Sequence, residues 1–152
     1  MPSTNLTNFL REHKVKYTTV SHTPAYTAQE IAASAHLSGM KVAKSVVVKI
    51  DGRFCILVEP ANYKADLKAL QTELGAHSVE LAHEYEFEDT FPGCETGAIP
   101  PIGELFDVDV YVDDVIKYQD EIAFNAGNHS ELIKMRYSDF EKLVKPKCVH
   151  LH

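Results

Sequence analysis

The sequence has little of what marks several common protein classes. It contains no tryptophan, no repeated unit and no apolar run approaching the ~18 residues of a membrane span. Its first residues, MPSTNLTNFLREHK, do not place an apolar stretch after a basic one, so we expect no secretory signal. The three cysteines (Cys55, Cys94 and Cys148) are an odd number at wide spacing, which favours reduced thiols and predicts a cytoplasmic location.

The chain is also short of positive charge. Its 15 Lys and Arg residues stand against 22 Asp and Glu residues, a formal net charge of -7. A dedicated nucleic-acid binder usually carries a basic stripe, because releasing counterions from phosphates supplies most of its affinity. We therefore expect no DNA partner and no membrane partner, and any contact with a polyanion has to be local.

Length and periodicity predict one α+β domain over residues 1–152. Adjoining strands are mixed with helices in no strict alternation, which indicates a mixed, strongly curved β-sheet with helices on its outside. The turn residues Asp51-Gly52 predict a tight hairpin between the two strands that flank them. The helices expected from apolar spacing cover about 3–12, 27–38, 63–74, 83–91 and 138–145, and the strands cover 17–20, 45–50, 53–60, 78–82, 105–114, 121–126 and 130–135.

Three local patterns refine these elements. Ser3 or Thr4 is expected to cap the first helix, and Gly39 to end the second helical unit. Thr27 with Glu30, and Ser138 with Glu141, have the spacing of capping boxes. The stretch LFDVDVYVDD (105–114) alternates apolar and polar residues, which predicts a strand with one face in water.

Most motifs of metal and nucleophile chemistry are missing. The sequence has no Walker loop, no dinucleotide fingerprint and no GxSxG elbow. Cys94, in a stretch rich in Gly and Pro, is the one cysteine that we consider as a reactive thiol. Cys148-Val-His150-Leu-His152 could offer zinc ligands, but no second ligand pair accompanies it. We expect no metal and no organic cofactor.

Lys44 is an unusual residue in the strand MKVAKSVVVKI (40–50). Alternate residues of a strand point to the same side, so Lys44 lies in one row with Val46, Val48 and Ile50. A structural lysine at this place extends its ammonium group to water along the apolar surface. A functional lysine presents the ammonium group to a ligand. The pattern alone leaves both interpretations open.

Two Gly-containing segments are the other candidates for a site. In GAIPPIG (97–103), two prolines can simply make a rigid surface connection, or they can hold Gly97 where backbone amides approach a ligand. In NAGNHS (125–130), a hairpin turn explains Gly127 but does not require His129.

Taken in order, VAKSVVVK, GAIPPIG and AGNHSELIKM resemble the YbaK-type aminoacyl-tRNA editing domain. This module is inserted in bacterial prolyl-tRNA synthetases and also occurs as free-standing trans-editing deacylases. The early segment SHTPAYTAQEIA is similar as well, and the resemblance covers about residues 15–145. It implies an α+β fold whose strongly curved sheet and flanking helices surround a central pocket.

The resemblance also implies an activity and a set of site residues. The activity is hydrolysis of the ester that joins a wrong amino acid to the terminal adenosine of tRNA. Lys44, Gly97 and His129 match the family's pocket lysine, its GxxxP loop and its GxH histidine, and we expect them to be the catalytic group. The residues expected to contact substrate are His22, Lys41, Ala98, Ile99, Pro100, Pro101 and Gly127.

The chemistry suits these residue types. An aminoacyl ester is already activated, so the protein has to supply position, a water molecule and hydrogen-bond donors for the carbonyl oxygen, which backbone amides of a glycine loop can do. Lysine can hold a phosphate or ribose oxygen, and histidine can bind the substrate amine or the water. In some members of the family the ribose hydroxyl of the substrate is thought to help activate that water.

One departure from the family bears on the substrate. Members that remove cysteine from tRNA usually carry Ser where this chain has Pro100. The resemblance therefore favours Ala or Ser over Cys on the tRNA for proline, with a synthetase as a possible second partner. A non-catalytic module that binds a nucleotide or amino acid, or docks on a synthetase, remains the alternative, and another esterase activity is a third possibility.

Overall fold

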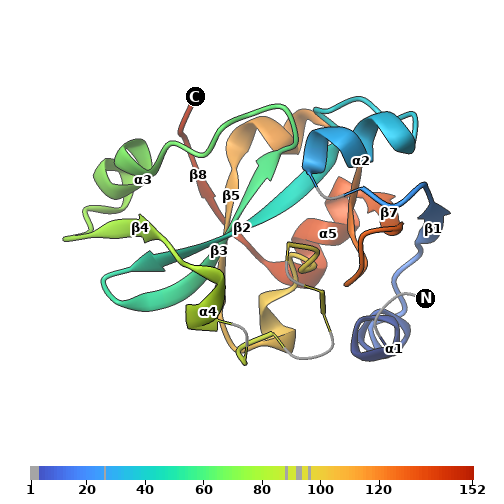
Figure 1. Ribbon diagram of the computed structural model, residues 1–152, viewed down its shortest axis with the longest axis horizontal. Helices are drawn as coiled ribbons and strands as arrows, with labels where there is room; N and C mark the ends of the chain where they lie inside the picture. Colours follow the sequence, from blue (N-terminus) through green and yellow to red (C-terminus); the bar gives the residue numbers. More distant parts are fainter. Residues whose placement is uncertain (1–3, 26, 88, 92–93, 96) are drawn as a thin grey trace.

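One mixed β-sheet runs through the part of the chain that the structure describes. The structure is a computed structural model, and it describes residues 4–25, 27–87, 89–91, 94–95 and 97–152. The strand order is β1-β7-β6-β2-β3-β5-β8, and β4 pairs with β2 outside this path (Figure 1). The elements in chain order are α1 (Thr4–Glu12), β1 (Thr18–Ser21), α2 (Ala28–Ser34), β2 (Val42–Ile50), β3 (Arg53–Pro60), α3 (Leu67–Leu74), β4 (Val79–Leu81), α4 (Glu84–Phe87), η1 (Gly103–Leu105), β5 (Asp109–Asp113), η2 (Asp114–Tyr118), β6 (Glu121–Asn125), β7 (Glu131–Arg136), α5 (Tyr137–Val144) and β8 (Lys147–Val149).

The hairpin of β2 and β3 forms the centre of the sheet, as the sequence predicts. Ile50 pairs with Arg53 across the two turn residues, so the register continues without interruption to Ala43 opposite Pro60. β2 begins at Val42, three residues before the predicted start of the strand. This extension brings Lys44 inside the strand rather than ahead of it.

The second edge of β2 is shared between two other strands. β6 runs parallel to it at Val42 and Ala43, and β4 runs antiparallel to it at Val48–Ile50. Among the described residues, no strand pairs with this edge between those two places. The sheet therefore divides beside residues 44–46, at the end of β6, and the loops that follow β6 are free to fill the gap.

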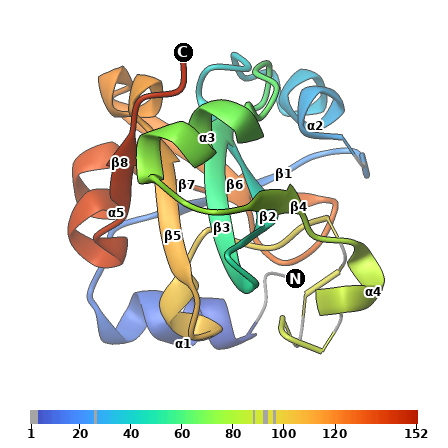
Figure 2. The same ribbon diagram turned by 90° about the vertical axis from the view of Figure 1, so that its left-hand side faces the viewer.

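Helices cover both faces of the sheet. On one face, α1 and α5 pack through Leu10 and Phe140 into the largest core cluster, which includes Ile56 of β3 and Phe124 of β6. On the other face, Figure 2 shows α3 lying across the sheet, where Leu70 packs in a second cluster with Leu57 and Tyr111. A third cluster joins α2 to β6 and β7.

The strand predicted over 105–114 differs from β5. η1 and a turn with Asp107 at a φ of 56° occupy the first part, and β5 begins only at Asp109. The prediction of a face in water is wrong, because Tyr111 is 9% exposed and Asp113 is 0% exposed. Alternation along this strand separates two buried faces, one under α3 and one in the main core.

The ends of three helices also differ from the predicted ends. Thr27 caps α2 by accepting the Glu30 amide, as predicted, but α2 ends at Ser34, well before Gly39. Ser138 caps nothing, because α5 begins at Tyr137 after Arg136. α1 begins at Thr4, and Ser3 lies outside the described residues.

Other bounds differ more simply. α3 begins at Leu67 behind its cap Asp66, and α4 is confined to Glu84–Phe87. The sequence did not predict β8, which pairs in parallel with β5. In the described ranges, no helix is both long enough and apolar enough to cross a membrane.

Candidate functional site

Lys44 has a charged partner directly across the hairpin. The β2–β3 register places it opposite Glu59, and its Nζ donates a hydrogen bond to the backbone carbonyl of Tyr63. The side chain is half-buried, and this burial lowers the pKa of Lys44, while the charge of Glu59 raises it by a smaller amount. A lysine ammonium has three donors, so two remain for other partners after the bond to Tyr63.

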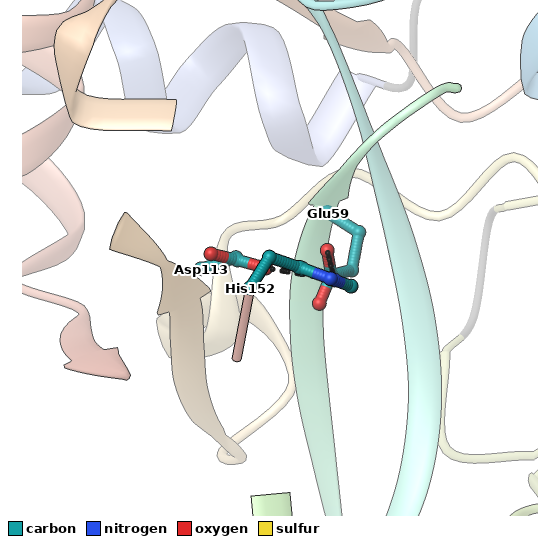
Figure 3. Close-up of side chains that lie close together, drawn as sticks. All are labelled: Glu59, Asp113 and His152. Atoms are coloured by element: carbon teal, nitrogen blue, oxygen red, sulfur yellow. Dashed lines mark ion pairs between the residues drawn. The ribbon is translucent and has the colours of Figure 1, made fainter. Parts of the chain in front are cut away.

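Glu59 belongs to a buried group that we call the carboxyl cluster, formed by Glu59, Asp113 and His152. Both carboxyl groups are 0% exposed, and Nε2 of His152 lies 3.6 Å from Oε2 of Glu59 and 3.3 Å from Oδ2 of Asp113 (Figure 3). Burial, and then hydrogen bonding and repulsion from Asp113, raise the pKa of Glu59 to about 9. At neutral pH Glu59 is therefore protonated, beside the second buried carboxyl group, that of Asp113.

The carboxyl cluster is also the one group in the described part of the chain whose ligand atoms lie as close together as metal binding requires. Two observations favour a protonated Glu59 over a metal ion. Lys44 is close enough to act on Glu59 electrostatically, and its ammonium would repel a bound cation. Asp113 also uses its Oδ1 to accept the Val115 amide at 3.3 Å, as the cap of η2. The expectation of no metal therefore stays a prediction, with this cluster as the place to test it.

The segment that begins at Gly97 is fastened to the end of β6. The Gly127 amide donates to the Ala98 carbonyl at 3.1 Å, and the Glu95 amide donates to the Gly127 carbonyl at 2.8 Å. Nδ2 of Asn125 donates to the Gly97 carbonyl at 3.4 Å. Gly97 has a φ of 84° and is exposed, so a left-handed turn of the backbone lies at the surface beside β6.

His129 lies against this segment. A Cβ atom placed on Gly97 would lie 3.5 Å from Cε1 of the His129 ring, so the imidazole lies within van der Waals reach of a side chain at this position. The side chain of His129 is 11% exposed, and its Nε2 lies 3.6 Å from Oε2 of Glu95. The first strand reaches the same place, because the amide of Ala25 donates to the His129 carbonyl at 3.0 Å and that of His22 donates to the Ser130 carbonyl at 2.9 Å.

Asn125 links this group to Lys44. The parallel register pairs Ala43 with Phe124, both in the main core, so the residues that follow them, Lys44 and Asn125, leave the paired stretch on the opposite face of the sheet. Asn125 in turn holds Gly97. Its Oδ1 is buried, as is Nε2 of His22, and neither atom has a hydrogen-bond partner among the described residues. Buried polar atoms of this kind commonly receive a water or a ligand.

The remaining predicted residues have different surroundings. Lys41 is exposed, and its carbonyl accepts the amide of Ala123 in β6. Ile99 is 5% exposed and packs in the main core, and Pro100 and Pro101 are also buried. These three buried residues anchor the loop in the protein interior. They support the exposed Gly97 and do not themselves face solvent.

Two other predictions concern sulfur and the C-terminal segment. Burial raises the pKa of Cys94 to about 11, so this thiol is protonated at neutral pH and is a poor nucleophile. In the segment of Cys148, the cysteine is exposed, Nδ1 of His150 lies 3.0 Å from Asp114, and His152 turns to the carboxyl cluster. The three side chains do not gather as one set of zinc ligands.

The prediction from sequence missed Glu59 and Asn125, although both left a signal. Glu59 lies in the apolar row of Cys55 and Leu57, just as Lys44 lies in the row of Val46, and a two-residue turn at Asp51-Gly52 pairs the two charges. Asn125 is a polar residue that closes a buried strand. Asp113 and His152 had no such signal, because their contact depends on how the last residues of the chain fold back.

The predicted central pocket is the part of the fold that the distances support least directly. The His129 ring lies beside the position of Gly97, and Asn125 donates to the Gly97 carbonyl, but the ammonium group of Lys44 is turned toward Tyr63. A hollow of about 780 Å³ lies elsewhere, between β7, α5 and the segment that follows α1.

Comparison with known proteins gives one consistent result. A family model for the aminoacyl-tRNA editing domain matches residues 22–143. The prolyl-tRNA editing protein ProX of Acetoanaerobium sticklandii is 28% identical over 142 residues, which cover 90% of this chain and 86% of that protein. The multifunctional Ser/Thr-tRNA deacylase ProXp-y of Escherichia coli strain K12 is 30% identical over 113 residues, 71% of this chain and 67% of that protein.

Longer proteins and solved structures agree with this match. The proline–tRNA ligase of Bacillus subtilis strain 168 is 34% identical over 98 residues, which cover 63% of this chain and 17% of the ligase. A crystal structure described as a candidate trans-editing enzyme for prolyl tRNA synthetase superposes with a TM-score of 0.81 at 18% identity, covering 97% of this chain and 94% of that one. At that identity the superposition shows a shared fold.

Proposed function

The chain belongs to the aminoacyl-tRNA editing domain family, and from this we propose that it is a free-standing deacylase that edits mischarged tRNA in trans. The bond to be broken is the ester between the amino acid and the ribose of the terminal adenosine. Water adds to the ester carbonyl, the bond from that carbon to the ribose oxygen breaks, and the ribose oxygen takes up a proton. The products are a free amino acid and an uncharged tRNA.

The observation that carries the proposal is the meeting of three distant segments at the end of β6. A side chain at position 97 would lie against the His129 ring, and Asn125 donates a hydrogen bond to the Gly97 carbonyl from the end of β6, the strand that pairs with β2 just before Lys44. These are the segments through which the chain resembles the family. A merely structural role for Gly97 and His129 does not require their segments to meet at the end of β6, the strand that pairs with β2 just before Lys44.

Each residue has a role that suits its position. We assign to Lys44 the anchoring of a ribose or phosphate oxygen through the donors that Tyr63 leaves free. The exposed peptide groups at Gly97 face the ester carbonyl, where an amide donor stabilises the negative charge that develops on oxygen. His129 and Asn125 offer polar contacts to the substrate amine or to the attacking water.

We propose tRNA for proline carrying a small amino acid as the substrate, with Ser and Ala ahead of Cys. The names of the two relatives support this, since one edits prolyl-tRNA and the other removes Ser or Thr from tRNA. Pro100 is buried beneath the loop, so it shapes the floor of the site without offering a hydroxyl group. A small site excludes larger residues sterically but discriminates weakly among small ones.

The test is a panel of tRNA for proline charged with Ala, Ser, Cys or Pro, incubated with the purified protein and with buffer alone. We expect faster loss of the ester from the Ala and Ser forms than from the Cys form, and protection of the correct Pro form. Loss at the buffer rate for all the charged forms would contradict the proposal and leave the chain as a binding module on an editing fold.

A further inference from the structure

One hollow in the described part of the protein carries an unusual set of charges. It has a volume of about 780 Å³ and lies between the segment after α1, strand β7 and helix α5. We call it the basic groove, and the cations that line it are Lys14, Lys16, Lys134, Arg136 and Lys142. Two carboxylates, Glu121 and Asp139, line it as well.

The charge of the basic groove is opposite to that of the rest of the molecule. Five cations and two carboxylates give the groove lining a charge of +3 with histidine neutral. Subtracting them from the 15 cations and 22 carboxylates of the whole chain leaves 10 against 20, a charge of -10. The chain therefore concentrates a third of its cations in one hollow while carbonyl and carboxylate oxygens dominate elsewhere.

The cations of the basic groove are also not neutralised from within. None of their side chains makes an ion pair or a hydrogen bond with the residues that the structure describes, although Lys49 pairs with Glu86 and Arg53 with Asp109. Four of the five are exposed, and Lys134 is half-buried. Because like charges held together repel one another, such a groove is stabilised by a partner with several negative charges.

The basic groove leads toward the candidate site. Lys134 pairs with Ala123, and Ala123 pairs with Val42, so Lys134 lies two strand spacings, roughly 10 Å, from the strand that carries Lys44. Lys134 also lines a smaller hollow together with Lys41. Lys41 thus lies near one cation of the groove and three residues before Lys44 in the chain, and Glu121 lines the same smaller hollow.

We propose that the basic groove binds the phosphodiester backbone of the tRNA acceptor end while the terminal aminoacyl-adenosine lies beside Lys44, Gly97 and His129. This inference rests on the proposed function. A nucleic-acid backbone presents regularly spaced phosphates, which lysine side chains bind as point charges without a fixed geometry. The arrangement explains how a chain with a net charge of -7 can hold a polyanion: the contact is local, and the acidic remainder faces away.

The test compares two substrates that differ in their phosphates. One is a serylated tRNA for proline, and the other is 3′-O-seryl-adenosine, which has no phosphate to place in the groove. The variant is Lys134→Glu with Arg136→Glu. The matched control is Lys68→Glu with Lys117→Glu, which makes the same change of charge at two exposed lysines outside the groove.

We expect the groove variant to lose about ten-fold or more in kcat/KM on the tRNA and to hydrolyse seryl-adenosine at the wild-type rate. Removing two phosphate contacts should also reduce the slope of log kcat/KM against log salt by about 1.4, at about 0.7 for each contact on a single strand. The control should keep most of the wild-type slope. Equal losses on both substrates, or equal losses in variant and control, would overturn the inference.

A binding measurement separates this inference from the proposed function. If the wild type hydrolyses neither substrate, the proposed function fails, and the groove is tested by fluorescence anisotropy with an uncharged acceptor-stem hairpin ending in CCA. Weaker binding by the groove variant, with wild-type binding by the control, would support the groove. Equal binding of a polyglutamate peptide of the same charge would overturn the choice of RNA as its partner.

Discussion

Replacing Glu59 by Gln should change how the stability of the protein depends on pH. The pKa of Glu59 is about 9 in the folded protein, against 4.5 for an ordinary glutamic acid. As pH rises from 4.5 to 9, the unfolded chain releases this proton and the folded protein keeps it. Folding stability contributed by this group is therefore complete below pH 4.5 and is lost toward pH 9.

The size of the effect follows from the same shift. One group that is protonated only in the folded state lowers the free energy of unfolding by about 1.4 kcal/mol for each pH unit. Between pH 5.5 and 7.5 the wild type should lose roughly 2–3 kcal/mol through Glu59. Glutamine has the shape of the protonated acid and does not titrate, so Glu59→Gln should not show this loss.

Urea unfolding at several pH values measures the difference directly. We expect the free energy of unfolding of Glu59→Gln, relative to wild type, to rise steadily between pH 5.5 and 7.5. The matched control is Glu12→Gln, an exposed carboxylate at the end of α1, which should keep a constant offset. A constant offset for Glu59→Gln as well would show that Glu59 is ionised in the folded protein. That result would refute the raised pKa of Glu59.

Three further predictions concern the loop and the carboxyl cluster. A Cβ on Gly103 would lie 2.1 Å from the Val108 carbonyl oxygen, so Gly103→Ala should lower the free energy of unfolding by more than Gly75→Ala, where no atom lies within 4 Å and only the left-handed backbone costs about 1 kcal/mol. Gly97→Ala also has room for its Cβ, but the φ of 84° should cost the variant about 1 kcal/mol of stability, measured by urea unfolding. Its initial rate of deacylation should fall further than the smaller folded fraction accounts for. The third prediction is tested by elemental analysis after dialysis against zinc and then against metal-free buffer, and we expect well below one metal ion per chain. One tightly held ion in the wild type that is lost in Glu59→Gln would show that the carboxyl cluster binds metal.

The centre of the fold could be predicted because local chemistry specifies it. Asp51-Gly52 determines the turn, the turn determines the register of β2 and β3, and the register pairs Lys44 with Glu59. Thr27 and Glu30 are enough to begin α2, since the cap needs only contacts within one turn. The candidate site could be predicted from the sequence for a different reason, because its three segments resemble a family in their residues and order.

The predictions that failed concern elements that depend on contacts between distant residues. The alternation of β5 could not reveal that α3 covers its second face, so Tyr111 and Asp113 appeared to be exposed positions. β8 is three residues long and exists because it pairs with β5. The partnership of His152 with the carboxyl cluster follows from that pairing, and no pattern within the last residues indicates it.

The most direct test of the editing site is the rate of ester loss from serylated tRNA for proline with Lys44→Ala. Lys49→Ala is the matched control on the same strand, where the loss of the Lys49–Glu86 pair should change stability little. We predict that Lys44→Ala hydrolyses the ester at least about ten-fold more slowly than wild type, the effect of about 1.4 kcal/mol on the barrier, while Lys49→Ala keeps the wild-type rate. Hydrolysis by Lys44→Ala at the wild-type rate would contradict the account of the site.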